Sequence, residues 1–175
     1  SQVWDNVLGL AKFYDAEILV ARTVYNRFSQ SSTQDKKLII ERDRSDDAPA
    51  RTRREYWWDA KVLPYVHDER MELAPGLIWC GETNTTPTAA DPLSGMDPYT
   101  GRASSIFPHP RIAMRSVPSM AHEQVKLMYT TGTVTQRNYI QRKAGQLAEF
   151  HHSYGALLVE VDADGNWFCR QLNAD

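Results

Sequence analysis

The sequence predicts an α/β fold, organised as a single domain around a mixed β-sheet of about six strands. Residues 3–14 place apolar side chains three and four positions apart, as on one face of a helix, and a β-branched run follows at residues 17–24. Short strand-like runs recur through the second half of the chain. Near the C-terminus, Asp164-Gly165 separates two of these runs, which is a strong hairpin signal because both turn residues need positive φ.

The first half of the chain adds few further elements. Residues 37–41 are predicted to form a short strand. Residues 42–54 mix charges of both signs and hold no apolar residue larger than alanine or proline, so we expect a mobile surface loop. A second helix is expected near residues 55–63, and Pro64 would end or kink it.

The second half supplies most of the sheet. A buried strand at residues 17–24 and strands near residues 77–80, 111–117, 125–130, 156–161 and 166–172 are expected to form one mixed sheet. The last two should form an antiparallel hairpin. Residues 83–102 are almost entirely turn formers, and loops of that length are often binding loops or lids. A passive insertion is the alternative.

Composition excludes several classes of protein. No apolar run approaches the ~20 residues of a membrane span, and the N-terminus lacks the pattern of a signal peptide, so no membrane partner is expected. Two cysteines form no disulfide framework and favour a reducing cytosol. The chain begins without methionine and stops soon after a strand-like run, so we expect a fragment of a longer protein.

Positive charge is concentrated between Pro98 and Lys143, where seven Lys or Arg residues accompany Glu123 alone in a chain of net charge −2. Within this segment, Thr131-Gly132 follows a predicted strand, and backbone N–H groups at such a turn can face an anion. Asn138 and Tyr139 can contact a base. The predicted anion- or nucleic-acid-binding residues are Arg102, Thr131, Gly132, Thr133, Arg137, Asn138, Arg142, Lys143 and His151. Alternatively, Gly132 and Gly145 are turns, and Arg142-Lys143 is the wet face of a short helix.

No catalytic or metal-binding residue can be assigned from the sequence. His151 and His152 are neighbours at a strand entry, where adjacent side chains point to opposite faces. The histidines show no zinc-like spacing with either cysteine. The acidic run around Asp164 lacks the glycine and the acid that a calcium loop needs at its sixth and twelfth positions. Phosphate-loop, dinucleotide and nucleophile-elbow fingerprints are also absent from the sequence.

Three runs carry a family resemblance: CGETNTTPTAADPLSG, YTGR and TTGTVTQRNYIQRKAGQLAEFHHSYGALLVEVDADGNWFCRQL. They resemble the N-terminal part of a group of tailed-phage proteins in which a calcineurin-like metallophosphoesterase domain follows. The resemblance covers roughly Pro64 to Asp175. It implies a phage origin, the host cytoplasm, and a parent hydrolase with two divalent metal ions. The Gly-Asp and Asn-His-Asp motifs that hold those ions in the family do not occur here, so the metals and the catalytic residues belong to the downstream domain.

Three functional hypotheses follow. The first is a non-catalytic domain of a phage phosphoesterase- or nuclease-like protein, which binds or positions nucleic acid or another phosphate-bearing ligand. The second is a nucleotide-binding or hydrolytic domain in its own right, with a site formed by residues 83–102 and 130–145. The third is an assembly module that uses the Trp57-Trp58 surface. Whether the chain is itself an enzyme stays open at this point.

Overall fold

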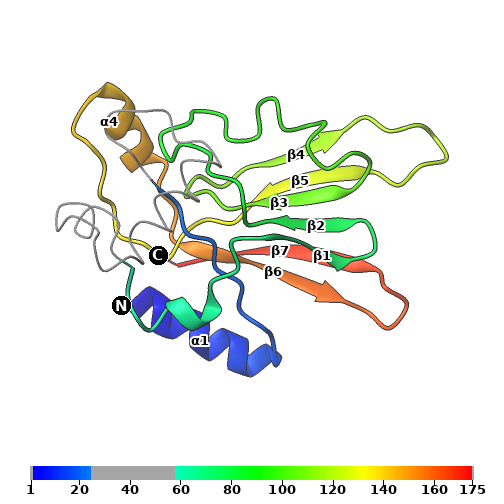
Figure 1. The fold of residues 1–175 in the computed structure, drawn as a ribbon, viewed down its shortest axis with the longest axis horizontal. Helices are drawn as coiled ribbons and strands as arrows, with labels where there is room; N and C mark the ends of the chain where they lie inside the picture. Colours follow the sequence, from blue (N-terminus) through cyan, green and yellow to red (C-terminus); the bar gives the residue numbers. More distant parts are fainter. Residues whose placement is uncertain (1, 25–57, 175) are drawn as a thin grey trace, which may run out of the picture.

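The computed structural model describes residues 2–24 and 58–174. It has an α/β fold with a five-stranded mixed sheet, a separate C-terminal β-hairpin and two α-helices in this described part (Figure 1). The sheet strands are β1 (Arg70–Ala74), β2 (Leu77–Cys80), β3 (Ser104–Phe107), β4 (Met114–Val117) and β5 (Lys126–Thr130). Their order is β1-β2-β3-β5-β4, with parallel pairs at the centre and antiparallel pairs at both edges. None of the helices in the described ranges is long and apolar enough to cross a membrane.

One face of the sheet packs against the hairpin, which consists of β6 (Gly155–Val161) and β7 (Trp167–Asn173). Leu77, Trp79 and Ile106 form the buried centre of this layer. The hairpin contributes Leu157 and Trp167. Alternation along each strand places these side chains on the same face, so this cluster is the core between sheet and hairpin.

The opposite face is covered by residues 81–103, which connect the parallel strands β2 and β3 through turns alone. A parallel crossover usually contains a helix. Here Leu93, which is 1% exposed, comes from this connection and packs with Cys80, Phe107 and Met128. The irregular connection therefore takes the place of a crossover helix.

The Lys126 side chain holds this connection on the sheet. Lys126 begins β5 and is 5% exposed, and its ammonium group donates hydrogen bonds to the carbonyl oxygens of Asp97 and Gly101, the latter at 2.6 Å. Buried carbonyl groups need donors, and a charged donor makes stronger hydrogen bonds than a neutral one. One cation on a strand thus satisfies two backbone groups of a segment that has no regular structure.

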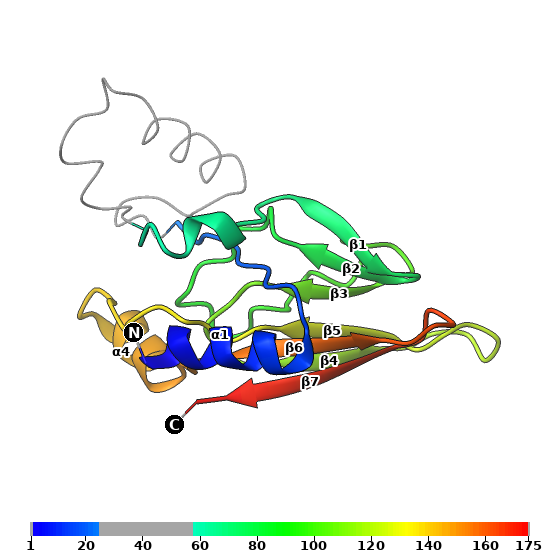
Figure 2. The same ribbon diagram turned by 90° about the horizontal axis from the view of Figure 1, so that it is seen from below.

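The helices lie at the periphery. α1 (Gln2–Tyr14) runs alongside β6 and buries Trp4, whose ring meets Tyr65 edge-on at 5.4 Å between centroids (Figure 2). Tyr65 belongs to a short 3-10 helix, η1 (Leu63–Tyr65). α4 (Lys143–Phe150) lies beyond the carboxyl ends of β3 and β5 in both ribbon views.

The C-terminal hairpin is confirmed. β6 and β7 pair antiparallel over seven residue pairs, and Gly165 takes a φ of 83° in the turn. The Asp162 carboxylate closes this turn by accepting hydrogen bonds from the backbone N–H groups of Asp164 and Asn166. The expected strands at residues 77–80 and 125–130 are also present as β2 and β5.

A single sheet that includes the hairpin and residues 17–24 was the wrong expectation. β6 and β7 pair only with each other within the described chain. The 17–24 segment makes one isolated bridge, from Val20 to Val66. Its backbone is satisfied instead by side chains: the Asn84 amide pairs with both Val24 N and Val24 O at 2.9 and 3.0 Å. Such an extended segment has the composition of a strand, but side chains supply the partners that a neighbouring strand would offer.

Some expectations concern residues outside the described ranges. These are the strand at 37–41, the loop at 42–54 and the start of the helix at 55–63. In the described remainder of that helix, residues 60–62 form a turn and η1 follows, because Pro64 supplies no N–H group.

We predict that Lys126→Met lowers the free energy of unfolding by about 2–4 kcal/mol, because a hydrogen bond to a charged group contributes ~1.5–3 kcal/mol and two carbonyls lose their donor. Urea unfolding followed by circular dichroism measures the change. Lys12→Met, at an exposed position of α1, is the control and should change stability little. Equal stability of the two variants would show that the connection does not depend on Lys126.

Candidate functional site

The carboxyl ends of the parallel strands β2, β3 and β5 meet at one edge of the sheet. Ligands of α/β proteins commonly bind at this edge. β2 continues into residues 81–84, β3 into residues 108–110 and β5 into residues 131–133. The candidate site is therefore built from these three loops and from the segment that leads into α4.

His109 joins two of these loops. It is 2% exposed, and its Nδ1 accepts the N–H of Arg111 at 3.0 Å, which leaves Nε2 to donate to the Thr86 carbonyl at 3.1 Å. Its own backbone N–H donates to Thr131 Oγ1 at 3.3 Å. Burial lowers the pKa of His109, so the neutral form with the proton on Nε2 is favoured. The residue is a structural junction between the 81–103 connection and the turn after β5.

The turn at residues 131–133 is satisfied from within the protein. Gly132 has a φ of 77° and donates its N–H to the His109 carbonyl at 3.0 Å, while the Thr133 N–H donates to the Ser153 carbonyl at 3.0 Å. The Thr131 hydroxyl donates to the Gly132 carbonyl at 2.7 Å. The expectation that the N–H groups of this turn face an anion is therefore wrong, since the turn uses them to join the sheet to the start of β6.

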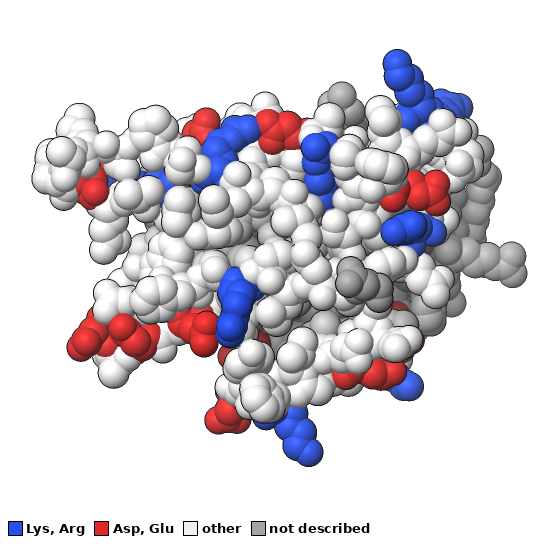
Figure 3. Space-filling model, turned by 180° about the vertical axis from the view of Figure 1, so that it is seen from behind, with Lys and Arg blue, Asp and Glu red and all other residues white. Residues whose placement is uncertain are grey.

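The seven cations of residues 98–143 are not equally available. Arg102 pairs with Glu123 at 3.1 Å, and Arg115 pairs with Asp91 at 2.5 Å. Lys126 is committed to the 81–103 connection. Figure 3 shows basic and acidic side chains mixed over one face of the molecule, with wide uncharged areas between them. Besides Lys126, the cations of this segment without an ion pair in the described part of the chain are Arg111 and the three near α4, which are Arg137, Arg142 and Lys143.

One of the cations near α4, Arg137, lies against a cluster of aromatic rings. The Arg137 guanidinium lies over the Tyr154 ring at 5.6 Å, and Tyr139 Oη lies 2.8 Å from Nδ1 of His152. His152 is 7% exposed, and its Nε2 donates to the Thr135 carbonyl at 2.9 Å. Burial lowers its pKa. These contacts fix the 134–140 segment against the start of β6.

Arg142 and Lys143 stand at the N-terminus of α4. Arg142 is the N-cap residue, and Lys143 opens the helix, so the alternative of a short helix with a wet face at these two residues describes the observed structure. Asn138, Arg142 and Lys143 are exposed, while His151 is half-buried and its ring contacts Phe150 edge-on. Among the residues that the structure describes, no carboxylate forms an ion pair with Arg137, Arg142 or Lys143.

The structure adds residues that the sequence reasoning did not place in a site. Tyr154 and Phe150 flank the basic segment, and His109 connects the loops. The setting of His109 between Pro108 and Pro110, directly after an apolar run, was a usable signal because prolines fix the backbone around a junction. Nothing in the sequence pattern indicates that Phe150 is exposed.

The 83–102 segment lies on the sheet rather than over an open site. Leu93 is buried in the core, and Tyr99 donates its hydroxyl proton to Glu82 at 2.8 Å. Only its first residues reach the carboxyl edge, where Thr86 bonds to His109. Residues 83–102 and 130–145 therefore meet through His109.

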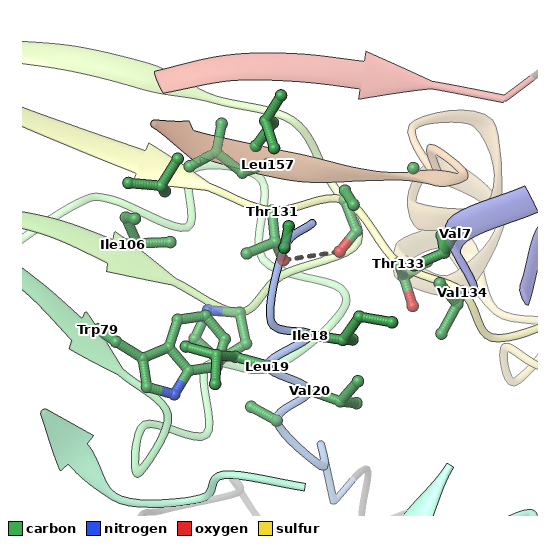
Figure 4. A pocket seen from close by; sticks show the side chains of 18 of the residues that line it. Val7, Ile18, Leu19, Val20, Trp79, Ile106, Thr131, Thr133, Val134 and Leu157 are labelled. Carbon is green, nitrogen blue, oxygen red and sulfur yellow. Dashed lines mark hydrogen bonds between the residues drawn. The ribbon is translucent and has the colours of Figure 1, made fainter. Parts of the chain in front are cut away.

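The structure also contains a cleft of about 600 Å³ between the sheet, α1, residues 15–23 and β6 (Figure 4). Leu19, Trp79, Ile106 and Leu157 supply apolar walls. The cleft extends to the carboxyl ends of β3 and β5, where threonines of the 131–135 segment line it. Its size and its combination of apolar walls with a hydroxyl-lined end are typical of small-molecule pockets.

The described part of the chain shows neither a cluster that could bind a metal ion nor a cysteine suited to act as a nucleophile. No group of three or more His, Cys, Asp and Glu side chains there is arranged to hold a metal ion. Burial raises the pKa of Cys80 to about 12 and that of Cys169 to about 11. Both thiols are therefore protonated near neutral pH, whereas a nucleophilic cysteine needs its thiolate form.

Comparison with known proteins points to a phage. Over 167 residues, which are 93% of this chain, the sequence is 36% identical to Protein A1 of Escherichia phage T5. The aligned part is 27% of Protein A1, so the chain spans about a quarter of that relative. No family model matches the chain, and no solved structure matches it. The similarity supports a phage origin for this α/β domain.

Because His109 is buried where its loops meet, we predict that the protein loses stability in acid. Because burial lowers the folded-state pKa of His109 below 6.5, the unfolded chain binds the proton first as pH falls. The free energy of unfolding should thus be fully retained above pH 6.5 and should decline as pH drops below that value. Urea unfolding at several values between about pH 7 and pH 5 measures the slope.

His109→Gln should reduce this slope, since glutamine does not titrate; the remainder should come from His152, whose pKa is lowered as well. His122→Gln, the same substitution at an exposed position before β5, is the matched control. If the His109→Gln variant shows the same slope as the wild type, the pH dependence of stability does not arise from His109.

Proposed function

We propose that this chain is a non-catalytic domain of a phage phosphoesterase- or nuclease-like protein, and that it binds or positions nucleic acid through residues 137–143. The observation that carries the proposal is that Arg137, Arg142 and Lys143 lack carboxylate partners among the described residues. They lie close together in sequence, in the same segment as Tyr139, and Arg137 lies over the ring of Tyr154.

Unpaired cations next to aromatic rings suit a nucleic acid because both of its components find a partner. Phosphates bind Lys and Arg with the release of counterions, which supplies most of the affinity. Rings and amide groups such as those of Tyr139 and Asn138 can contact bases. Thr131, Thr133 and His151 remain predicted contacts beside this surface, and Gly132 contributes backbone shape alone. Arg102 lies before the amino end of β3 and pairs with Glu123, so it does not belong to this surface.

The parent protein is proposed to carry a downstream calcineurin-like metallophosphoesterase domain. The resemblance of residues 64–175 to the first part of such phage proteins supports this. The chain's 27% share of Protein A1 adds only that this relative is longer than the chain. In this arrangement the downstream domain holds the divalent metal ions and cleaves the phosphoester, while this chain presents the nucleic acid to it. Both domains would act in the host cytoplasm.

A second candidate function is favoured by the cleft. Its hydroxyl-lined end at residues 131–135 and its apolar walls would suit a nucleoside or nucleotide, which makes the chain a nucleotide-binding domain in its own right. Isothermal titration with nucleotides separates this candidate from the first, because strand binding through residues 137–143 does not need the cleft. For the third hypothesis, an assembly module that uses the Trp57-Trp58 surface, the structure gives one relevant contact. The Arg22 guanidinium lies over the Trp58 ring at 5.2 Å.

Removal of two cations should weaken binding without changing sequence preference. We expect Arg142→Ala with Lys143→Ala to lower affinity for a labelled single strand of any sequence, because phosphate contacts read no bases. The slope of log affinity against log salt should fall in magnitude by about 1.4, or about 0.7 for each lost contact. Fluorescence anisotropy over a range of salt concentrations measures both quantities.

Lys12→Ala with Lys61→Ala is the matched control, since it removes the same net charge at exposed positions outside the site. If the control and the site variant weaken binding equally, the attraction arises from overall charge and not from residues 137–143. Absence of binding to the wild-type chain at low salt would overturn the proposal.

We also expect the chain alone not to hydrolyse bis-p-nitrophenyl phosphate with manganese, because two-metal hydrolysis needs ligands that hold two ions ~3.5–4 Å apart. A colorimetric assay of the purified chain tests this. Manganese-dependent turnover that stays with the protein through every purification step would make the chain an enzyme.

A further inference from the structure

Helix α4 packs with its smallest residues and exposes its largest apolar ones. Gly145 and Ala148 are its buried positions. Leu147 is 56% exposed and Phe150 is 85% exposed. In an ordinary surface helix the large apolar side chains face the core. The reversed arrangement indicates that the outer face of α4 contacts something other than this domain.

The close approach of the backbone fixes this orientation. A Cβ atom on Gly145 would lie 1.9 Å from the carbonyl oxygen of Ile140, so only glycine permits the contact. The helix is also closed at its end, where the His151 N–H bonds to the carbonyls of Leu147 and Ala148 at 3.2 and 3.1 Å. With Gly145 directed at residue 140, the opposite side of α4 must face solvent.

The exposed side of α4 combines a cation with apolar groups. Lys143, Leu147 and Phe150 are spaced four and three residues apart, which places them in one stripe along the helix. Arg142 precedes the stripe at the N-cap. The Phe150 ring meets the His151 ring edge-on at 5.4 Å, so one face of the phenyl group stays open.

We propose that this stripe is a base-stacking surface for single-stranded nucleic acid, with Phe150 stacking on an unpaired base and Lys143 and Arg142 contacting the neighbouring phosphates. The inference rests on the proposed function and specifies the class of ligand. Phe150 lies about 10 Å along the helix axis from Lys143, on the same exposed face. An exposed aromatic ring and cations on one face form the combination by which single strands are bound without sequence preference. Duplex bases are already stacked on one another and offer no free face to Phe150.

The charge around the stripe favours a polyanion over an apolar protein partner. Glu149 is the one acid within α4, and its carboxylate accepts a hydrogen bond from the Gln141 side chain at 3.3 Å. Arg142 and Lys143 have no ion-pair partner among the described residues. A partner that covers Phe150 must therefore also accommodate two positive charges, which a phosphate backbone does.

The test compares three labelled ligands on the full 175-residue chain by fluorescence anisotropy. They are an oligothymidine of about 12 nucleotides, an abasic strand of equal length and a duplex of equal length. The wild type should bind oligothymidine more tightly than the abasic strand or the duplex. Phe150→Ala should weaken binding of oligothymidine by about tenfold, should not change binding of the abasic strand, and should leave the salt dependence as in the wild type.

Phe150→Trp should restore the affinity, because it keeps an aromatic face. Phe13→Ala is the matched control, since Phe13 is 79% exposed on α1 and lies outside the stripe. Circular dichroism should show an unchanged fold for all three variants. This distinguishes loss of a contact from loss of structure.

Three outcomes show whether the stacking surface fails alone or together with the proposed function. If the chain binds all strands but Phe150→Ala binds oligothymidine like the wild type, the stacking surface is overturned and phosphate binding stands. A wild-type chain that binds the duplex or the abasic strand as tightly as oligothymidine overturns the stacking surface in the same way. If no nucleic acid binds even at low salt, both proposals are overturned, and a protein partner for α4 becomes the conclusion.

Discussion

The fold depends on burying both faces of three parallel strands without a crossover helix. Parallel strands expose no face to water in most proteins, so each face of β2, β3 and β5 needs a cover. On one face the cover is irregular chain, held by the Lys126 ammonium on two carbonyls and by Leu93 in the core. On the other face it is a hairpin that shares no strand pairing with the sheet. Both covers must be attached by contacts outside the β-ladders.

Those attachments explain why the N–H groups of Gly132 and Thr133 are not available to an anion. Gly132 and Thr133 bond to the His109 and Ser153 carbonyls, and the Gln171 side chain donates to the Thr131 carbonyl at 3.1 Å. A turn whose N–H groups hold two layers together cannot also present them to a phosphate. An anion in this region must therefore be bound by side chains. Residues 137–143, which lie near the carboxyl ends of the parallel strands, provide such side chains.

The sequence specified the parts of the fold that obey local patterns. The hairpin followed from Asp164-Gly165, and β2 and β5 followed from short apolar runs, since turn chemistry and alternation are local signals. β1 and β3 were not predicted, because their burial is decided by tertiary contacts. β1 carries charges at the edge of the sheet, and β3, the central strand, buries Ser104 and Ser105. The strand predicted at residues 17–24 was wrong for the opposite reason. Its composition is that of a strand, but composition cannot reveal that Asn84 takes the place of a neighbouring strand.

The candidate site shows the same division between local and tertiary information. Arg137, Arg142 and Lys143 could be named from charge alone, yet pairing with Asp91 and Glu123 removed Arg115 and Arg102 from the free cations, which no linear pattern reveals. Phe150 became visible only through α4. Its helix periodicity permits either face to be buried, and the Gly145 contact with residue 140 decides which. A single glycine thus determines that a phenyl ring, and not a polar side chain, shares the exposed face of α4 with Lys143.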